Sequence, residues 1–348
     1  MAKFRVGLTR DFLNENGEIN VIGFELLDQI ENLEYEFLSE YTDIVQPDQI
    51  KDFDAVISLL PKFTKESFVG VERLTAIGRW GVGYEMIDLE ACTEANIALY
   101  IAPDGVRRPM AQAIMTMLYA LSGQLLIKDR LTREGRWDDK YNHPGIGLQG
   151  KVLGSIGLGN IAKEMFKLAS PIGMIQLAFD PYASEEDAEK LGVRLVDFDT
   201  LLEQADFLAV NCPLTPQTRH FISDKELKKM KPTAYLINTA RGPIVDQKAL
   251  TEALINKEIA GAGLDVFTVE PVDPKDPLLQ MENVIVSPHG LGFTDELYRG
   301  LGESDVRGVL KLIEGEIPDH VVNKEVLAKP EFQRKLTQYK EQFQKEKC

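Results

Sequence analysis

The sequence contains few of the residues that build disulfide frameworks and metal centres. It has three cysteines, Cys92, Cys212 and Cys348, and four histidines among 348 residues. An odd and scattered set of cysteines argues against a disulfide framework and for a reducing compartment. Because no cysteine or histidine pair has the spacing of zinc ligands, we expect no metal site.

Basic residues and long apolar runs are also scarce. The chain has 39 Lys and Arg against 55 Asp and Glu, a net charge of −16, and so acidic a chain repels nucleic acid and anionic membranes. No segment approaches the roughly 20 apolar residues that span a bilayer. Residues 1–8 resemble a strand and lack the apolar core of a signal peptide. We therefore expect a cytoplasmic protein that binds neither nucleic acid nor membrane.

Short apolar runs alternate with amphipathic stretches through most of the chain, which is typical of parallel sheets covered by helices on both faces. The length suits two domains. The first strand candidates are residues 5–8, 35–38, 55–59, 74–78 and 97–101. A second series comprises residues 152–156, 175–179, 207–210, 234–238, 262–266 and 284–287. Six strands are the number in a doubly wound dinucleotide-binding sheet.

Helices are expected between these strands and after them. The clearest candidates are residues 110–126, 161–169, 201–204, 225–230, 247–257 and 295–314. Residues 330–348 are rich in Lys, Glu and Gln. Such a composition predicts a solvated helix or a loose tail at this end of the chain.

A glycine motif follows the first strand of the second series. Gly157-Leu158-Gly159-Asn160-Ile161-Ala162 matches G-x-G-x-x-G/A. Gly157 allows a tight turn, Gly159 lets the backbone approach a pyrophosphate, and Ala162 lets helix and strand pack closely. The helix that begins here presents free N–H groups and the positive end of its dipole to phosphates. The alternative is a tight strand–helix connection that binds no ligand.

Asp180 stands at the end of the next strand, at the separation expected of an acid that binds a ribose. A carboxylate there accepts hydrogen bonds from the ribose hydroxyls and repels a 2′-phosphate. The order of strand, loop, helix, strand and acid therefore favours an NAD site over the alternative without a ligand.

Three further side chains follow strands at the edge where ligands bind in open α/β sheets. Arg241, Glu270 and His289 come after the fourth, fifth and sixth strands. Oxidation of a 2-hydroxy acid needs a hydride acceptor, a base and a cation for the carboxylate. Arg241 offers a planar fork and His289 an acid–base group, while Glu270 would favour the imidazolium and fix its tautomer. Asp265 could accept a hydrogen bond from the nicotinamide carboxamide.

Each of these residues alone has a simpler structural explanation. Arg241 could pair with Asp246 at the surface, Glu270 could lie in a solvated turn, and His289 could cap a helix. Their joint position beyond three strands of one nucleotide-binding sheet favours the catalytic interpretation. For Cys212 we expect a packing role, because no cationic partner that would activate the thiol is identifiable.

At these residues the sequence resembles the D-isomer-specific 2-hydroxyacid dehydrogenase family. The matching segments are residues 153–161, 179–181, 212–220, 237–242, 263–271 and 287–289. The resemblance implies a catalytic set of Arg241, Glu270 and His289. It also implies cofactor contacts at Gly157, Gly159, Asn160, Ile161, Asp180, Cys212, Pro213, Thr218, Thr239, Ala240, Arg241, Asp265 and His289.

The resemblance further implies an α/β fold of two lobes. A flavodoxin-like, discontinuous substrate domain would comprise residues 1–107 and 299–348, and a Rossmann NAD-binding domain residues 108–298. The loop Gly81-Val82-Gly83 would hold the substrate carboxylate through its N–H groups, opposite Arg241. Members of the family are usually homodimers, so we expect a homodimer here.

Two other functions share this architecture. Formate and phosphite dehydrogenases have the same architecture. The formate enzymes typically have Gln in place of Glu270, since they transfer no proton. NAD-sensing corepressor-like modules retain the Arg-Glu-His set and are not excluded by it. Arg107 and Arg108 also have two interpretations: surface ion pairs, or a cleft position that binds a second anionic group of the substrate.

Overall fold

The computed structural model describes residues 3–19 and 23–344 of the chain. The chain divides into two compact units, Met1–Val106 with Thr294–Cys348, and Arg107–Phe293. The second boundary lies at Thr294 rather than at the expected residue 299. Thr294 is the N-cap of helix α10 (Asp295–Ile313), and its side chain accepts a hydrogen bond from the N–H of Leu297. The whole helix therefore belongs to the first unit.

The first unit contains a parallel sheet of five strands in the order β2-β1-β3-β4-β5. The strands are β1 (Phe4–Leu8), β2 (Leu33–Phe37), β3 (Ala55–Ser58), β4 (Ala76–Arg79) and β5 (Ala98–Ile101). This is the flavodoxin-like strand order. The five predicted strands are all present, and four buried residues fill β3, which lies in the middle of the sheet.

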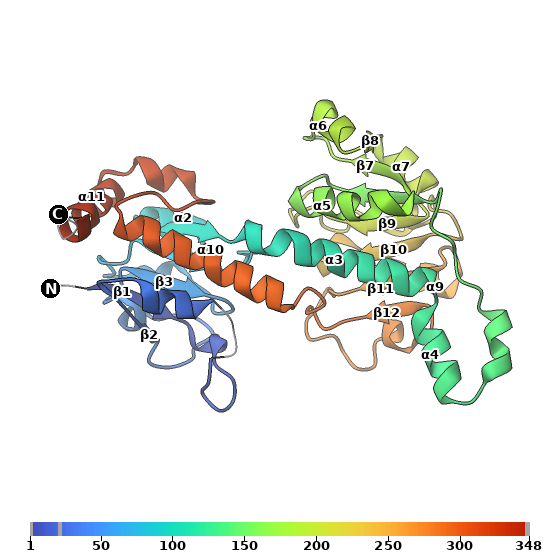
Figure 1. Ribbon diagram of the computed structural model, residues 1–348, viewed down its shortest axis with the longest axis horizontal. Helices are drawn as coiled ribbons and strands as arrows, with labels where there is room; N and C mark the ends of the chain where they lie inside the picture. Colours follow the sequence, from blue (N-terminus) through green and yellow to red (C-terminus); the bar gives the residue numbers. More distant parts are fainter. Residues whose placement is uncertain (1–2, 20–22, 345–348) are drawn as a thin grey trace. The chain divides into compact units, whose positions relative to one another are not determined.

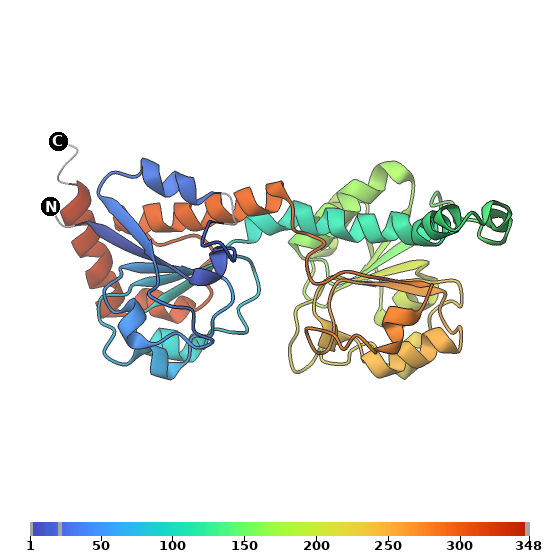
Figure 2. The ribbon, with the colours of Figure 1, turned by 90° about the horizontal axis from the view of Figure 1, so that it is seen from below.

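Helices cover both faces of this sheet. Helix α10 packs on β4 and β5, and α2 (Leu89–Glu94) packs on β5; Figure 2 shows α10 on one face and α2 on the other. The remaining helical segments of this unit are η1 (Arg10–Phe12), η2 (Phe24–Gln29), α1 (Pro47–Ile50), η3 (Lys65–Phe68), η8 (Lys324–Ala328) and α11 (Pro330–Gln344).

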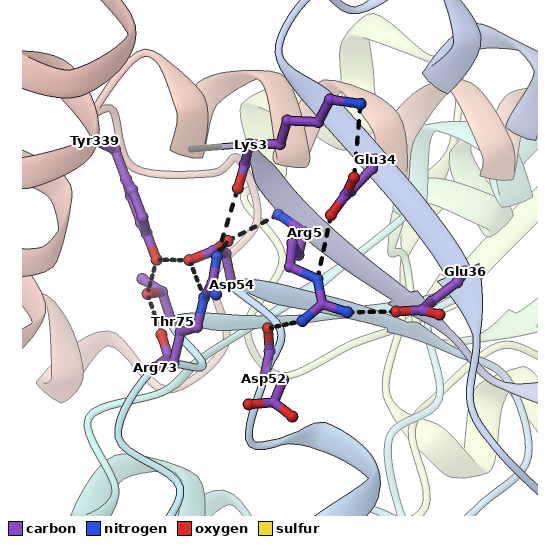
Figure 3. A network of polar contacts seen from close by, with 9 residues as sticks. All are labelled: Lys3, Arg5, Glu34, Glu36, Asp52, Asp54, Arg73, Thr75 and Tyr339. Atoms are coloured by element: carbon purple, nitrogen blue, oxygen red, sulfur yellow. Dashed lines mark hydrogen bonds and ion pairs between the residues drawn. The ribbon is translucent and has the colours of Figure 1, made fainter. Parts of the chain in front are cut away.

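Helix α11 is not the loose or solvated segment that its composition predicts. Phe332 and Leu336 are buried, and the Tyr339 ring meets the Phe4 ring of β1 edge to face at 5.0 Å. The Tyr339 hydroxyl donates to the buried Asp54 carboxylate at 3.1 Å (Figure 3). Apolar residues at helical spacing outweigh the charged ones, because they pack against the sheet.

Asp54 is the centre of this polar network at the amino end of β3. Its carboxylate also accepts hydrogen bonds from Arg73 at 2.6 and 3.0 Å and from the backbone N–H of Arg5 at 2.8 Å. Thr75 and Tyr339 share a further hydrogen bond of 2.7 Å. Asp54 is only 4 % exposed. Its charge is tolerated in this buried position because both carboxylate oxygens accept hydrogen bonds.

The second unit contains a parallel sheet of seven strands in the order β12-β11-β10-β9-β6-β7-β8. Its strands are β6 (Val152–Ile156), β7 (Ile175–Phe179), β8 (Arg194–Leu195), β9 (Phe207–Val210), β10 (Tyr235–Asn238), β11 (Gly261–Leu264) and β12 (Val284–Val286) (Figure 1). The order reverses between β6 and β9, as in a Rossmann sheet. The sheet has one strand more than the six predicted, since the two-residue β8 is too short to produce a sequence pattern.

Two hydrophobic clusters cover the faces of this sheet. One cluster contains residues of α3 (Pro103–Ser122) and α5 (Asn160–Ala169), and the other contains residues of α7 (Phe198–Gln204) and α9 (Gln247–Ile255). The other helical segments are α4 (Leu125–Arg133), η4 (Trp137–Asn142), η5 (Ser170–Ile172), α6 (Glu185–Lys190), α8 (Asp224–Leu227), η6 (Gly242–Ile244) and η7 (Pro277–Gln280).

The helix expected over residues 110–126 is two helices. Helix α3 ends at Ser122, and Gln124 takes a left-handed conformation with φ of 49° before α4 begins. Within residues 3–19 and 23–344, no single helix is long and apolar enough to cross a membrane; α3 and α4 meet the length and composition only as a pair bent by 57°.

Candidate active site

The glycine motif forms an open helix start beside a tight turn. Gly157 has φ of 95°, and a Cβ on it would lie 2.7 Å from the carbonyl oxygen of Asn211, so only glycine fits. Gly159 is the N-cap of α5 and provides no side-chain cap. No atom lies within 4 Å of the position that its Cβ would take. In the described part of the chain, the N–H groups of Asn160 and Ile161 meet no acceptor.

Asp180 lies directly beside this turn. One carboxylate oxygen accepts a hydrogen bond from the N–H of Leu158 at 2.8 Å, and the other accepts one from Tyr182 at 2.8 Å. The carboxylate is therefore fixed at the carboxyl end of β7, next to the glycine loop. The uncapped start of α5 and the free space at Gly159 fit the pyrophosphate of a dinucleotide. The fixed carboxylate of Asp180 fits its ribose.

The loop after β9 is held by its own threonines. The Thr218 hydroxyl donates to the carbonyl of Pro213 at 2.6 Å and accepts from the N–H of Thr215 at 2.7 Å. Cys212 packs against the hydrophobic cluster beneath this loop. Burial, with a smaller effect of the nearby Asp180 carboxylate, raises the pKa of the Cys212 thiol to about 11. The contact with the hydrophobic cluster agrees with the packing role expected for Cys212, and a thiol with a raised pKa is a poor nucleophile.

Asn238 shapes the loop that carries Arg241, and the sequence interpretation gave it no role. Its side chain is 1 % exposed. The amide donates to the carbonyl of Arg241 at 3.0 Å and accepts from the N–H of Ala240 at 3.0 Å. The available signal was a polar residue that ends an otherwise apolar strand. Arg241 is half-buried, and its Nη1 donates to the carbonyl of Ala240 at 2.7 Å.

The loops after β10 and β11 touch through their backbones. A Cβ on Gly242 would lie 1.9 Å from the carbonyl oxygen of Phe267. Glycine alone allows this approach. It fixes the segment that follows Arg241 against the segment that leads to Glu270.

The side chains of Glu270 and His289 make the contact that the sequence analysis considered possible. His289 Nδ1 lies 2.7 Å from Glu270 Oε2, and their side chains are 47 % and 36 % exposed. The other Glu270 oxygen accepts a hydrogen bond from the N–H of Phe267 at 2.9 Å. One oxygen of the carboxylate is thus held by the backbone and the other contacts Nδ1 of the ring, so this contact does not involve Nε2 of His289.

Asp265 holds the loop on which His289 lies. Its buried carboxylate accepts hydrogen bonds from the N–H groups of Gly290 and Leu291 at 3.0 and 3.2 Å. His289 itself has φ of 52°, and these two bonds brace that conformation from the next residues. A contact of Asp265 with a nicotinamide carboxamide remains a prediction.

The second unit therefore brings the predicted cofactor and catalytic residues to one edge of its sheet. They follow β6, β7, β9, β10, β11 and β12, whose carboxyl ends coincide because all the strands are parallel. Thr239 is buried beside them.

The exposed side chain of Arg108 forms an ion pair with Glu164 at 3.3 Å. This contact supports the interpretation of Arg108 as a residue in a surface ion pair. Among residues 3–19 and 23–344, no cluster of three His, Cys, Asp or Glu residues could hold a metal ion.

The predicted substrate loop belongs to the first unit. Gly81, Val82 and Gly83 follow β4, at the carboxyl end of that sheet, and Gly81 has φ of 130°. The carbonyl of Gly81 accepts a hydrogen bond from the N–H of Ala102 at 2.9 Å. The N–H groups of Val82 and Gly83 donate to no acceptor among the described residues.

Residues 115–290 match the family described as D-isomer specific 2-hydroxyacid dehydrogenase, NAD binding domain. Glyoxylate reductase of Korarchaeum cryptofilum is 37% identical over 285 residues, which are 80% of this chain and 86% of that protein. D-3-phosphoglycerate dehydrogenase of Methanocaldococcus jannaschii is 40% identical over 279 residues, 79% of this chain and 53% of that protein. The chain thus spans about half of the latter.

Solved structures agree with this assignment. D-lactate dehydrogenase with NAD+ from Lactobacillus jensenii superposes with a TM-score of 0.76 at 27% identity, over 92% of this chain and 99% of that chain. The family description names an NAD binding domain over these residues, and the strand order of the second unit is that of a Rossmann sheet. The chain belongs to the D-isomer specific 2-hydroxyacid dehydrogenase family and is an NAD-dependent 2-hydroxyacid dehydrogenase.

Proposed function

We propose that this enzyme interconverts a small 2-keto acid and the corresponding D-2-hydroxy acid, with His289 as acid and base, Glu270 as its partner and Arg241 as the carboxylate ligand. The contact of 2.7 Å between His289 Nδ1 and Glu270 Oε2 carries this proposal. It fixes the imidazole so that Nε2 can exchange a proton with the substrate oxygen.

The bound nicotinamide supplies the hydride in reduction and accepts it in oxidation. In reduction, His289 donates the Nε2 proton to the keto oxygen, while the Nδ1 proton stays hydrogen-bonded to Glu270. The Glu270 carboxylate stabilises the imidazolium before the proton leaves. Arg241 binds the substrate carboxylate through its planar fork and polarises the carbonyl. Gly81 and the open N–H groups of Val82 and Gly83 are further proposed contacts of the substrate.

The cofactor contacts that we propose follow the same edge of the sheet. The phosphates meet the N–H groups at the start of α5, Asp180 accepts hydrogen bonds from the ribose hydroxyls, and the backbone of the loops after β9 and β10 lines the rest. The proposed residues are Gly157, Gly159, Asn160, Ile161, Asp180, Cys212, Pro213, Thr218, Thr239, Ala240, Arg241, Asp265 and His289.

A panel of 2-keto acids tests this function. NADH and NADPH absorbance decay is followed with glyoxylate, pyruvate, hydroxypyruvate and a phosphorylated 2-keto acid. Glyoxylate and the phosphorylated acid are tested first, because the relatives are named glyoxylate reductase and D-3-phosphoglycerate dehydrogenase. We expect turnover with NADH, and a D-configured product from every acid of the panel except glyoxylate, whose reduction product is achiral. His289→Ala should lower kcat by about 10²–10⁴-fold and leave NADH binding nearly intact, since His289 is one of many proposed cofactor contacts. No turnover of any acid, or full activity of the variant, contradicts the proposal.

Two other activities of this architecture are less well supported. A formate-type enzyme transfers no proton, whereas Glu270 and His289 form a pair suited to moving one. An NAD-sensing module would bind NADH and reduce no acid, so the panel separates it from an enzyme.

We further propose a cytoplasmic homodimer. Support for a second copy comes from apolar side chains that are exposed on α3, α4 and η4: Tyr119, Leu125, Leu126, Trp137 and Tyr141. Exposed apolar groups of this size commonly mark protein interfaces. Sedimentation equilibrium should give twice the chain mass, and Trp137→Glu should reduce it to a monomer. A wild-type monomer would contradict this part of the proposal.

A further inference from the structure

Three neighbouring loops at the carboxyl end of the five-stranded sheet are joined by hydrogen bonds. Strand β3 lies between β1 and β4. The N–H of Trp80, which follows β4, donates to the carbonyl of Ser58 at the end of β3 at 2.9 Å. The N–H of Leu60, which follows β3, donates to Oδ2 of Asp11, which follows β1, at 2.7 Å. The loop that contains Leu60 therefore begins beside the proposed substrate loop, which starts directly after Trp80.

Leu60 presents an apolar side chain at this edge on a fixed backbone. It is 58 % exposed, whereas Pro61, directly after it, is buried and restricts the backbone on that side. The hydrogen bond to Asp11 holds the other side. An exposed leucine alone is ordinary, but one that is held in place beside a substrate loop is suited to contact an uncharged part of a ligand.

Asp11 brings a negative charge to the same place. In the described part of the chain it forms no ion pair, and its second oxygen, Oδ1, is buried without a hydrogen-bond partner. One oxygen is enough to hold the Leu60 N–H, as an asparagine would also do. The carboxylate therefore adds a charge to this contact, and a negative charge beside an apolar side chain disfavours an anion.

Two arginines of this edge donate to other loops. Nη1 of Arg10 donates to the carbonyl of Leu38 at 3.4 Å, and Leu38 follows β2, on the side of β1 away from β3. Nε of Arg79 donates to the carbonyl of Gly83 within the proposed substrate loop at 2.5 Å. Neither contact involves the loop that contains Leu60.

We propose that Leu60 determines specificity by contacting the third carbon of the substrate or the group on it, and that Asp11 is a positioning residue that holds Leu60 and opposes an anionic group there. The substrate class that follows is the 2-keto acids with no charge beyond the carboxylate, such as glyoxylate, pyruvate and hydroxypyruvate, rather than phosphorylated ones. This inference rests on the proposed function of the loop Gly81-Val82-Gly83, because that loop would place the substrate beside Leu60.

The first test compares two acids that differ by one phosphate group, hydroxypyruvate and 3-phosphohydroxypyruvate. The wild-type kcat/KM should be at least about tenfold higher for hydroxypyruvate. Leu60→Arg should raise the kcat/KM for the phosphorylated acid about tenfold relative to that for hydroxypyruvate, because a charge-assisted contact is gained. Val69→Arg makes the same change at an exposed apolar residue between η3 and β4 and should leave the ratio unchanged.

Three results would overturn the role of Leu60. They are a wild-type preference for the phosphorylated acid, the same ratio in wild type and Leu60→Arg, and an equal change of the ratio in Val69→Arg.

The second test separates the charge of Asp11 from its hydrogen bond. Asp11→Asn keeps an acceptor for the Leu60 N–H, so it should raise the kcat/KM for 3-phosphohydroxypyruvate about threefold or more and leave the value for hydroxypyruvate within about twofold. Asp11→Ala also loses the acceptor and should raise the KM for both acids, because Leu60 is no longer held. If the ratio of the two acids in Asp11→Asn equals the wild-type ratio, the role of the charge is overturned.

A binding measurement separates this inference from the proposed reaction. D-glycerate and 3-phospho-D-glycerate are titrated calorimetrically into the NADH complexes of wild type and Leu60→Arg, in which neither ligand can be oxidised. Tighter binding of glycerate by wild type and of phosphoglycerate by Leu60→Arg supports the inference even if no keto acid is reduced. Turnover in the panel with the same order of affinities in both proteins overturns the inference and leaves the proposed function standing. Absence of binding of both ligands by the wild type also overturns it.

Discussion

Gly242 approaches Phe267 so closely that a Cβ on Gly242 would lie 1.9 Å from the Phe267 carbonyl oxygen. The two residues belong to the loops after β10 and β11. One loop carries Arg241, and the other leads to Glu270, whose carboxylate is held by the N–H of Phe267. The spacing between the proposed carboxylate ligand and the proposed acid–base pair therefore depends on a residue without a side chain.

Gly242→Ala should separate these loops. The added methyl meets backbone, which cannot move aside as a flexible side chain can, so Arg241 and Glu270 shift relative to each other. We expect kcat/KM to fall by about 10²-fold or more, the scale of a 1 Å misplacement of reacting groups, with a lower melting temperature. Gly159→Ala is a useful comparison, since its Cβ would meet nothing within 4 Å. It should retain the melting temperature and weaken mainly NADH. An active Gly242→Ala would contradict the assigned geometry.

Asp180 should determine the choice between NAD and NADP. Asp180→Ala removes the ribose acceptor, the charge that repels a 2′-phosphate and the hydrogen bond to Leu158. The KM for NADH should rise and the NADH-to-NADPH preference should fall. Asp180→Asn retains an acceptor without the charge, so it should relax the preference with a smaller loss of NADH affinity. Wild-type preference for NADPH would show that Asp180 does not select the cofactor.

The Asp54 network should contribute strongly to the stability of the first unit. Asp54→Ala removes the acceptor of hydrogen bonds from Arg73, Tyr339 and the Arg5 N–H, and should lower the free energy of unfolding by about 3–5 kcal/mol because buried donors are left unpaired. Tyr339→Phe removes the hydrogen bond to the Asp54 carboxylate and the one shared with Thr75, and should cost about 1.5–3 kcal/mol. Asp48→Ala, at an exposed pair, should change nothing measurable in the same denaturant titration. If Asp54→Ala unfolds at the wild-type denaturant concentration, the network is not a source of stability.

Asp305 of helix α10 is fully buried. Burial raises the pKa of its carboxyl to about 8, and this shift has a defined effect on stability. A carboxyl whose folded pKa exceeds its unfolded value contributes stability at low pH that is lost as the pH rises towards the folded pKa. Wild-type stability relative to Asp305→Asn should therefore decline between about pH 4 and pH 8 and level off above it, by on the order of a few kcal/mol in total. Chemical denaturation of both proteins across this range measures the difference. A constant difference would mean that Asp305 does not titrate abnormally.

Local pattern was sufficient to predict much of this fold. The limits predicted for β6, β7 and β9 coincide with those observed, because an apolar run between turn residues is a complete local signal. The contact of Glu270 with His289 was inferred only as a consequence of parallel strands that end at one edge. This contact could be predicted from the sequence because both residues follow strands of the same parallel sheet.

Other features depend on tertiary contacts between distant residues. Asp54 and Tyr339 are 285 positions apart, so neither reveals that α11 docks beside β1. The apolar residues Phe332, Leu336, Tyr339 and Phe343 recur at helical spacing, but Lys, Glu and Gln between them predicted a solvated segment. Asn238 and Gly242 act through backbone groups of neighbouring loops, and no residue spacing specifies such contacts.

The pH dependence of keto-acid reduction in Glu270→Gln tests the central claim most directly. Glutamine keeps the size of the side chain and removes the negative charge 2.7 Å from His289 Nδ1, so the imidazolium becomes less favoured. We predict that the alkaline limb of the kcat/KM profile moves to lower pH in Glu270→Gln, with NADH affinity unchanged. Superimposable pH profiles of wild type and Glu270→Gln would contradict the assignment of His289 and Glu270 as a coupled acid–base pair.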